Sequence, residues 1–130
     1  AARVQLAVAR VLKECVHDAR FRKELQAAGG MQHVVQLLAR APSEQVGTVV
    51  AHILEVCGRD ALASEIIDHA GGVVLLLDAL PVGGSELRSA AAAALASLTA
   101  RGEAAATVFE RGGVQELARL LVAQRREKAE

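Results

Sequence analysis

Residues 28–38 read Ala-Gly-Gly-Met-Gln-His-Val-Val-Gln-Leu-Leu, and this stretch has two echoes in the 130-residue chain. The first echo, residues 70–80, reads Ala-Gly-Gly-Val-Val-Leu-Leu-Leu-Asp-Ala-Leu, and the second, residues 111–121, reads Arg-Gly-Gly-Val-Gln-Glu-Leu-Ala-Arg-Leu-Leu. The second glycine of the pair is Gly30, Gly72 and Gly113, so the spacings are 42 and 41 residues. A constant period of this size indicates an array of stacked helical repeats.

A second motif recurs with the same period. Residues 8–15 read Val-Ala-Arg-Val-Leu-Lys-Glu-Cys, residues 50–57 read Val-Ala-His-Ile-Leu-Glu-Val-Cys, and residues 91–98 read Ala-Ala-Ala-Ala-Leu-Ala-Ser-Leu. Leu54 and Leu95 align in these copies, and we expect both in the core. The alignment also identifies the opening segment as the last helix of an earlier repeat rather than as a targeting peptide.

Each repeat is predicted to contain three helices. The Gly-Gly pair supplies the positive φ that ends the first helix, and Pro42 or Pro81 stops the second. We expect Ser43 and Ser85 to cap the third helix, with an acidic residue favourable in its first turn. The expected ranges are 20–27, 61–69 and 103–110 for first helices, 31–40, 73–80 and 114–126 for second helices, and 2–15, 44–57 and 85 or 86 to 99 for third helices.

This pattern resembles the armadillo family. That family has an apolar-Gly-Gly turn, a second helix of the form Ile/Val-x-x-Leu-Val-x-Leu-Leu and a third helix of the form Ala-Ala-x-Ala-Leu-x-Asn-Leu. The resemblance implies an all-α, right-handed α-solenoid forming one domain over residues 1–130. It divides the chain into a final helix at 2–15, full repeats at 16–57 and 58–99, and a partial repeat at 100–127. We expect the chain to be a slice of a longer array.

The composition excludes some classes of function. Hydrophobic residues make up 52% of the chain and aromatic residues 2%, and 15 basic residues balance 15 acidic ones. Nucleic-acid binding through charge needs a cationic excess, and binding of single strands uses aromatic stacking platforms. We therefore expect no nucleic acid among the partners. We also expect no membrane, because no apolar run is long enough to span a bilayer.

The sequence contains no motif of an enzyme or of a metal site. The four histidines, His17, His33, His52 and His69, have no metal-ligand spacing, and no nucleophile elbow, P-loop or zinc motif is present. We expect no catalysis, no cofactor and no small-molecule substrate. Cys15 and Cys57 are predicted to be buried and too far apart for a disulfide. So few cysteines favour a reducing, intracellular location, most simply the cytoplasm, with nuclear, cytoskeletal and ciliary sites left open.

The resemblance also implies where a partner would bind. In armadillo proteins that hold extended peptides, the third helices line a groove with a ladder of Asn residues and a Trp one turn earlier. The Asn positions here hold Glu14, Val56 and Ser97, and the Trp positions hold Arg10, His52 and Ala93. A peptide-groove adaptor of the importin alpha or catenin kind is therefore the alternative interpretation. The leading interpretation is a non-catalytic protein-interaction scaffold.

Charge is distributed unevenly along the chain. Residues 1–40 carry a net charge of +4, residues 41–80 of −5 and residues 81–130 of +1. Such asymmetry can orient a partner, so we expect a protein or peptide partner with an acidic segment. The candidate partner-binding residues on the third-helix face are Arg3, Arg10, Glu14, Gln45, His52, Glu86 and Ser97.

Overall fold

The computed structural model describes residues 2–100 and 103–129, and these residues form helices joined by short turns, with no β-strand. The all-α prediction is confirmed. Predicted helix ends lie within one residue of the observed ends, except that the last helix runs three residues further. In chain order the helices are α1 (Ala2–Cys15), α2 (Ala19–Ala27), α3 (Gly30–Ala39), α4 (Glu44–Cys57), α5 (Ala61–His69), α6 (Gly72–Ala79), α7 (Ser85–Thr99), α8 (Ala104–Glu110) and α9 (Gly113–Ala129).

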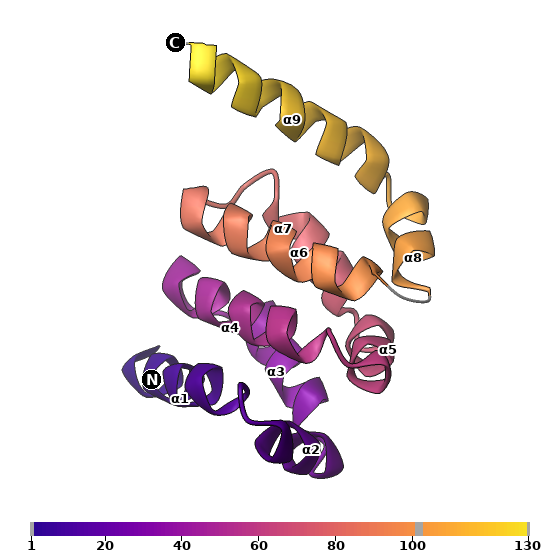
Figure 1. Ribbon diagram of the computed structural model, residues 1–130. Coiled ribbons are helices and arrows are strands. Elements are labelled where there is room, and N and C mark those ends of the chain that lie inside the picture. The colour runs from indigo at the N-terminus through magenta and orange to yellow at the C-terminus, as the bar shows by residue number, and fades with distance from the viewer. Residues whose placement is uncertain (1, 101–102, 130) are drawn as a thin grey trace.

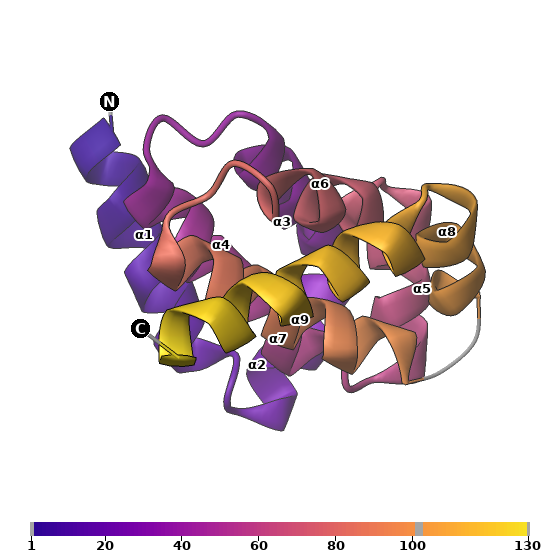
Figure 2. The same ribbon diagram turned by 90° about the horizontal axis from the view of Figure 1, so that it is seen from above.

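Helices that are one period apart in the sequence lie side by side. α1 contacts α4 and α4 contacts α7, so these three form one row, with α3 and α6 packed against them (Figure 1). α5 and α8 form a further row at one side of the stack (Figure 2). α1 and α9 lie at opposite ends of the stack (Figure 1). This arrangement fits an α-solenoid, in which each repeat contacts only its neighbours.

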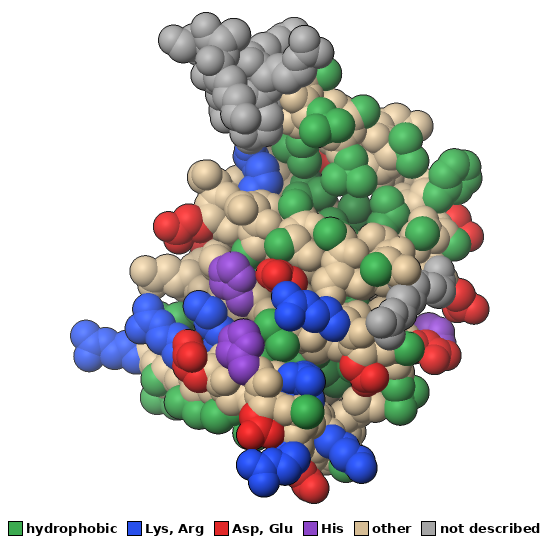
Figure 3. Space-filling model, viewed as in Figure 1, with side chains coloured by type: hydrophobic (Ala, Val, Ile, Leu, Met, Phe, Trp, Pro, Cys, Tyr) green, Lys and Arg blue, Asp and Glu red, His purple; other side chains and the backbone are tan. Residues whose placement is uncertain are grey.

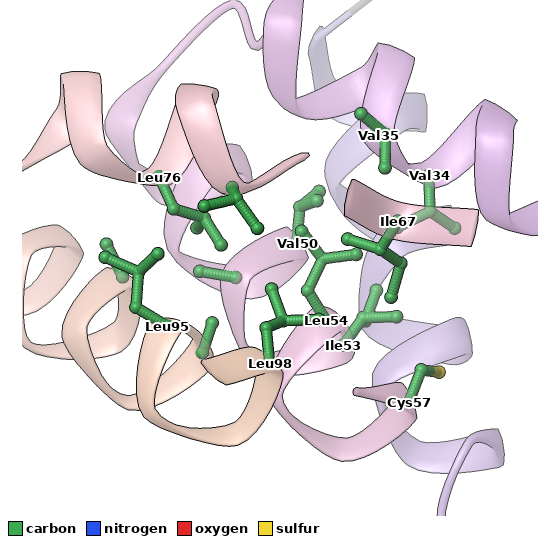
Figure 4. Packing of buried hydrophobic residues seen from close by; sticks show 14 of the residues in the cluster. Val34, Val35, Val50, Ile53, Leu54, Cys57, Ile67, Leu76, Leu95 and Leu98 are labelled. Carbon is green, nitrogen blue, oxygen red and sulfur yellow. The ribbon is translucent and has the colours of Figure 1, made fainter. Parts of the chain in front are cut away.

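The core is built from aliphatic side chains of the central helices. Leu54 of α4 is fully buried, and Leu95 of α7 is nearly so, which confirms the prediction for both leucines. Figure 4 shows Leu54 among Val50, Ile53 and Leu98, which come from the two adjacent helices α4 and α7. Because stacked helices share such side chains, the core is continuous from one repeat to the next.

The two glycines of each Gly-Gly pair serve different purposes. Gly71 has φ of +91°, in the left-handed region where residues with a Cβ are strained, and Gly29 and Gly112 are alike. Gly72 begins α6 and is buried, and a Cβ on it would lie 2.5 Å from Cγ2 of Ile67. The first glycine therefore permits the turn, and the second permits close packing of α6 on α5.

The third helices begin with different caps. Ser43 caps α4, since its Oγ accepts a hydrogen bond from the backbone N–H of Val46 at 3.3 Å, as predicted. The prediction for Ser85 is wrong, because Gly84 is the N-cap of α7 and Ser85 is its first residue. The N–H of Gly84 donates instead to Oε1 of Glu44 at 2.9 Å. This bond joins the starts of α4 and α7.

Candidate functional site

The seven predicted partner-binding residues all lie on the row of α1, α4 and α7. They occupy three levels of this row because equivalent positions recur every 41 or 42 residues and residues four or seven apart share one side of a helix. Each level contains one residue from each helix: Arg3, Gln45 and Glu86 at the first, Arg10, His52 and Ala93 at the second, and Glu14, Val56 and Ser97 at the third. The structure thus brings α1 residues beside α4 residues, and α4 residues beside α7 residues.

The N-terminal end of this row is cationic and open to solvent. Arg3 and Arg10 are exposed, and neither makes a salt bridge with any other described residue. Two helical turns separate them, about 10 Å along the axis. In Figure 3 most of the Lys and Arg side chains in view lie over the lower half of the molecule, with Asp and Glu side chains between them. This end of the row can therefore accept carboxylates.

The middle of the row is partly neutralised by its own contacts. Nδ1 of His52 lies 3.9 Å from Oε2 of Glu55, and a guanidinium nitrogen of Arg59 lies 3.6 Å from Oε1 of the same residue. Glu55 therefore has two basic neighbours, His52 on α4 and Arg59 in the loop that follows α4. The cationic character of the row belongs mainly to α1.

The hydroxyl of Ser97 already donates a hydrogen bond within the protein, so only its oxygen lone pairs are left for a ligand. Its hydroxyl donates to the backbone carbonyl of Glu55 at 2.6 Å, across the contact between α7 and α4. The serine therefore links two stacked helices. The neighbouring positions Val56 on α4 and Ala93 on α7 carry no polar side-chain atoms. These parts of α4 and α7 therefore have few groups that could hold a peptide backbone.

A hollow elsewhere on the molecule escaped the sequence reasoning. It has a volume of about 590 Å³ and lies between α2 and α5, with Arg22, Lys23 and Asp60 among its lining residues and Cys57 at its base. Arg22 is held there because it donates to the carbonyl of Val16 at 2.7 Å. The sequence reasoning missed this hollow because its walls come from the first helices of two successive repeats, and their packing distance is set only in the tertiary structure.

The two cysteines differ in environment. Cys57 is buried, and burial raises the pKa of its thiol to about 11. Cys15 is only half-buried, so the prediction that both lie in the core is wrong for Cys15. Its helix, α1, is packed on one side only, whereas α4 is covered by α1, α3 and α7. Both cysteines are free thiols.

The described residues contain neither a metal-binding cluster nor a helix that could span a membrane. Among residues 2–100 and 103–129, no three His, Cys, Asp or Glu side chains are grouped so that they could hold a metal ion. No described helix is both long and apolar enough to cross a bilayer.

The chain is similar in fold to solved structures of engineered proteins. No protein-family model matches the chain, and no curated protein matches it. It is similar to the crystal structure of an engineered protein, with a TM-score of 0.83 and 31% identity over 93% of this chain and 50% of that one. A second engineered protein gives the same TM-score and identity over 91% of this chain and 29% of that one. The chain thus spans half the length of the first protein and under a third of the second.

Proposed function

We propose that the chain is a non-catalytic protein-interaction scaffold of the armadillo type, in which α1, α4 and α7 are third helices of successive three-helix repeats in a right-handed solenoid. The supporting observation is the row itself. Equivalent positions on the stacked helices recur with the period of the repeat, and at the first level they present three exposed polar side chains, those of Arg3, Gln45 and Glu86. A surface of this kind suits an extended or helical segment of a protein partner within a larger protein or assembly.

The partner carries an acidic segment that binds at the α1 end. Arg3 and Arg10 are spaced to bracket two carboxylates, and His52 adds charge when it is protonated. Such contacts are solvent-exposed, so each contributes about 0.2–1 kcal/mol and weakens with added salt. The hydroxyl of Ser97 donates its hydrogen to the carbonyl of Glu55 and so cannot donate to a bound peptide backbone. This disfavours the alternative of a peptide-groove adaptor of the importin alpha or catenin kind. We place the chain in the intracellular, reducing environment that free thiols tolerate.

The test is selection of peptides from a random library, followed by binding measurements with fluorescence anisotropy. We expect enriched peptides to contain paired acidic residues. The double variant Arg3→Glu, Arg10→Glu should weaken their binding about twofold to thirtyfold, since two contacts of this strength are lost. The matched control is Arg20→Glu, Lys23→Glu, which reverses two charges on α2.

Both pairs lie on exposed helix surfaces, so their melting curves should match that of the wild-type chain. If the α2 control abolishes binding and the α1 variant does not, the binding surface is the hollow beside α2 and the choice of row is wrong. Peptides without acidic residues would contradict the proposed partner chemistry.

A further inference from the structure

We infer that the hollow between α2 and α5 binds a segment of a protein partner in which an apolar side chain lies beside an acidic one. The inference does not rest on the proposed use of the α1, α4 and α7 row, because other helices form the hollow. It follows from comparing the hollow with the equivalent contact one repeat later, where α5 packs against α8 (Figure 2).

Two polar links join α5 to α8. Oγ1 of Thr107 on α8 donates to Oδ2 of Asp68 at 3.3 Å. Nε2 of His69 lies 3.9 Å from Oε2 of Glu103, the residue before α8. Asp68 and His69 are the last two residues of α5, so both links hold the end of this helix against its neighbour.

Neither link has a counterpart between α2 and α5. The four linking positions hold other residues one repeat earlier, which are, for Asp68, Thr107, His69 and Glu103 in turn, Gln26, Ile66, Ala27 and Leu62. All four line the hollow, three of them are apolar, and none is buried. Because no polar pair joins the two helices here, the sides that face the hollow remain open to an occupant.

A large side chain at the hollow takes the place of a small one in the next repeat. Arg22 is equivalent to Ser64, whose buried hydroxyl donates to the carbonyl of Leu98 at 3.2 Å. The guanidinium of Arg22 instead donates through one nitrogen to the carbonyl of Val16 at 2.7 Å. Its other N–H groups have no hydrogen-bond partner among the described residues, so donors remain for an occupant.

The α2 wall of the hollow is cationic. Lys23 follows Arg22 and is exposed, and neither makes a salt bridge with a described residue. The acidic residue of the α5 wall is Asp60, whose Oδ2 accepts from the N–H of Ala63 at 3.2 Å. As the N-cap it faces the positive end of its own helix, which offsets its charge. The hollow therefore favours an occupant with a carboxylate beside α2.

The rest of the lining suits a peptide. Met31, Ala63 and Ile66 are among the apolar residues of the hollow and can surround an aliphatic side chain. The amide of Gln26 makes no hydrogen bond with a described residue, and because an amide both donates and accepts, it matches a peptide bond. Leu62 is 56% exposed, so apolar surface continues past the rim. This continuity favours a chain that crosses the rim over an enclosed small molecule.

The test begins with selection of peptides from a random library against the Arg3→Glu, Arg10→Glu variant of the full chain. This bait removes peptides that need the α1 end of the row. We expect the enriched peptides to carry Asp or Glu within a few residues of Leu, Ile, Val, Met or Phe. Synthetic copies are then titrated with the wild-type chain and followed by fluorescence anisotropy.

Two variants of the hollow are each paired with a control outside it. Lys23→Glu should weaken binding about twofold to fivefold, whereas Arg20→Glu, a reversal elsewhere on α2, should not change it. Leu62→Gln should weaken binding about fourfold or more, the loss for one buried methylene group. Val82→Gln is its control, since Val82 is 80% exposed in the loop before α7. All four residues are exposed, so melting curves should match that of the wild-type chain.

Three results would overturn the inference. The first is the absence of enriched peptides that pair an acidic with an apolar residue. The second is binding that neither Lys23→Glu nor Leu62→Gln weakens, which would place the peptides elsewhere. The third is competition by octanoate without any enriched peptide, which would assign the hollow to a small amphipathic acid. None of these results bears on the row, because the bait already lacks the cations of Arg3 and Arg10.

Discussion

Replacing Leu54 by alanine tests the register of the whole stack. Leu54 is fully buried in α4, whose neighbours are α1, α3 and α7. The change removes about three buried carbon groups, and at roughly 0.8 kcal/mol each the lost transfer free energy is about 2.4 kcal/mol. A residual cavity adds about 24 cal/mol per Å³, so the total destabilisation should be about 2–5 kcal/mol.

The measurement is urea denaturation followed by circular dichroism, with the slope of the unfolding free energy checked for each variant. Leu62→Ala is the matched control, because it is the same chemical change at a side chain that is 56% exposed on α5, and it should cost under about 1 kcal/mol. A loss below about 1 kcal/mol for Leu54→Ala would refute the assignment of this leucine to the shared core. It would also mean that the register of the third helices is wrong.

The further predictions concern three single residues, Gly71, Ser64 and Cys57. Gly71→Ala should destabilise the chain by about 1–2 kcal/mol, because φ is +91° there, and thermal melting checks it. Ser64→Ala should cost about 1 kcal/mol in urea denaturation, because the buried hydroxyl donates to the carbonyl of Leu98 at 3.2 Å. At pH 8 iodoacetamide should alkylate Cys57 more slowly than Cys15, because Cys57 is buried and its pKa is about 11. The folded state favours the neutral thiol of Cys57, whose pKa is about 11 when folded and about 9 when unfolded. This preference stabilises the folded chain below pH 9, and the stabilisation is lost as the pH rises from 9 toward 11. Urea denaturation over this pH range checks the expected fall in unfolding free energy, and a Cys57→Ala variant should lack that fall.

Much of the local structure could be predicted from particular residues. The Gly-Gly pairs located the turns because a positive φ is a property of one residue and its backbone. The period of the apolar positions predicted the burial of Leu54 and Leu95, since residues at helical spacing share one face. Ser43 was predicted as a cap for the same local reason, whereas Ser85 was displaced by Gly84, whose N–H has a partner in Glu44 forty residues earlier.

The sequence by itself determined the helices, their order and the period with which they repeat, because these depend on interactions within one turn or one helix. Only the tertiary structure decided which equivalent positions are covered. Val11 and Ile53 have the same place in the repeat, yet one is largely exposed and the other fully buried. Likewise the hydroxyl of Ser97 is taken by a carbonyl of the neighbouring helix. Burial and hydrogen bonding of these side chains depend on segments about forty residues away, and no local pattern records whether such a neighbour is there.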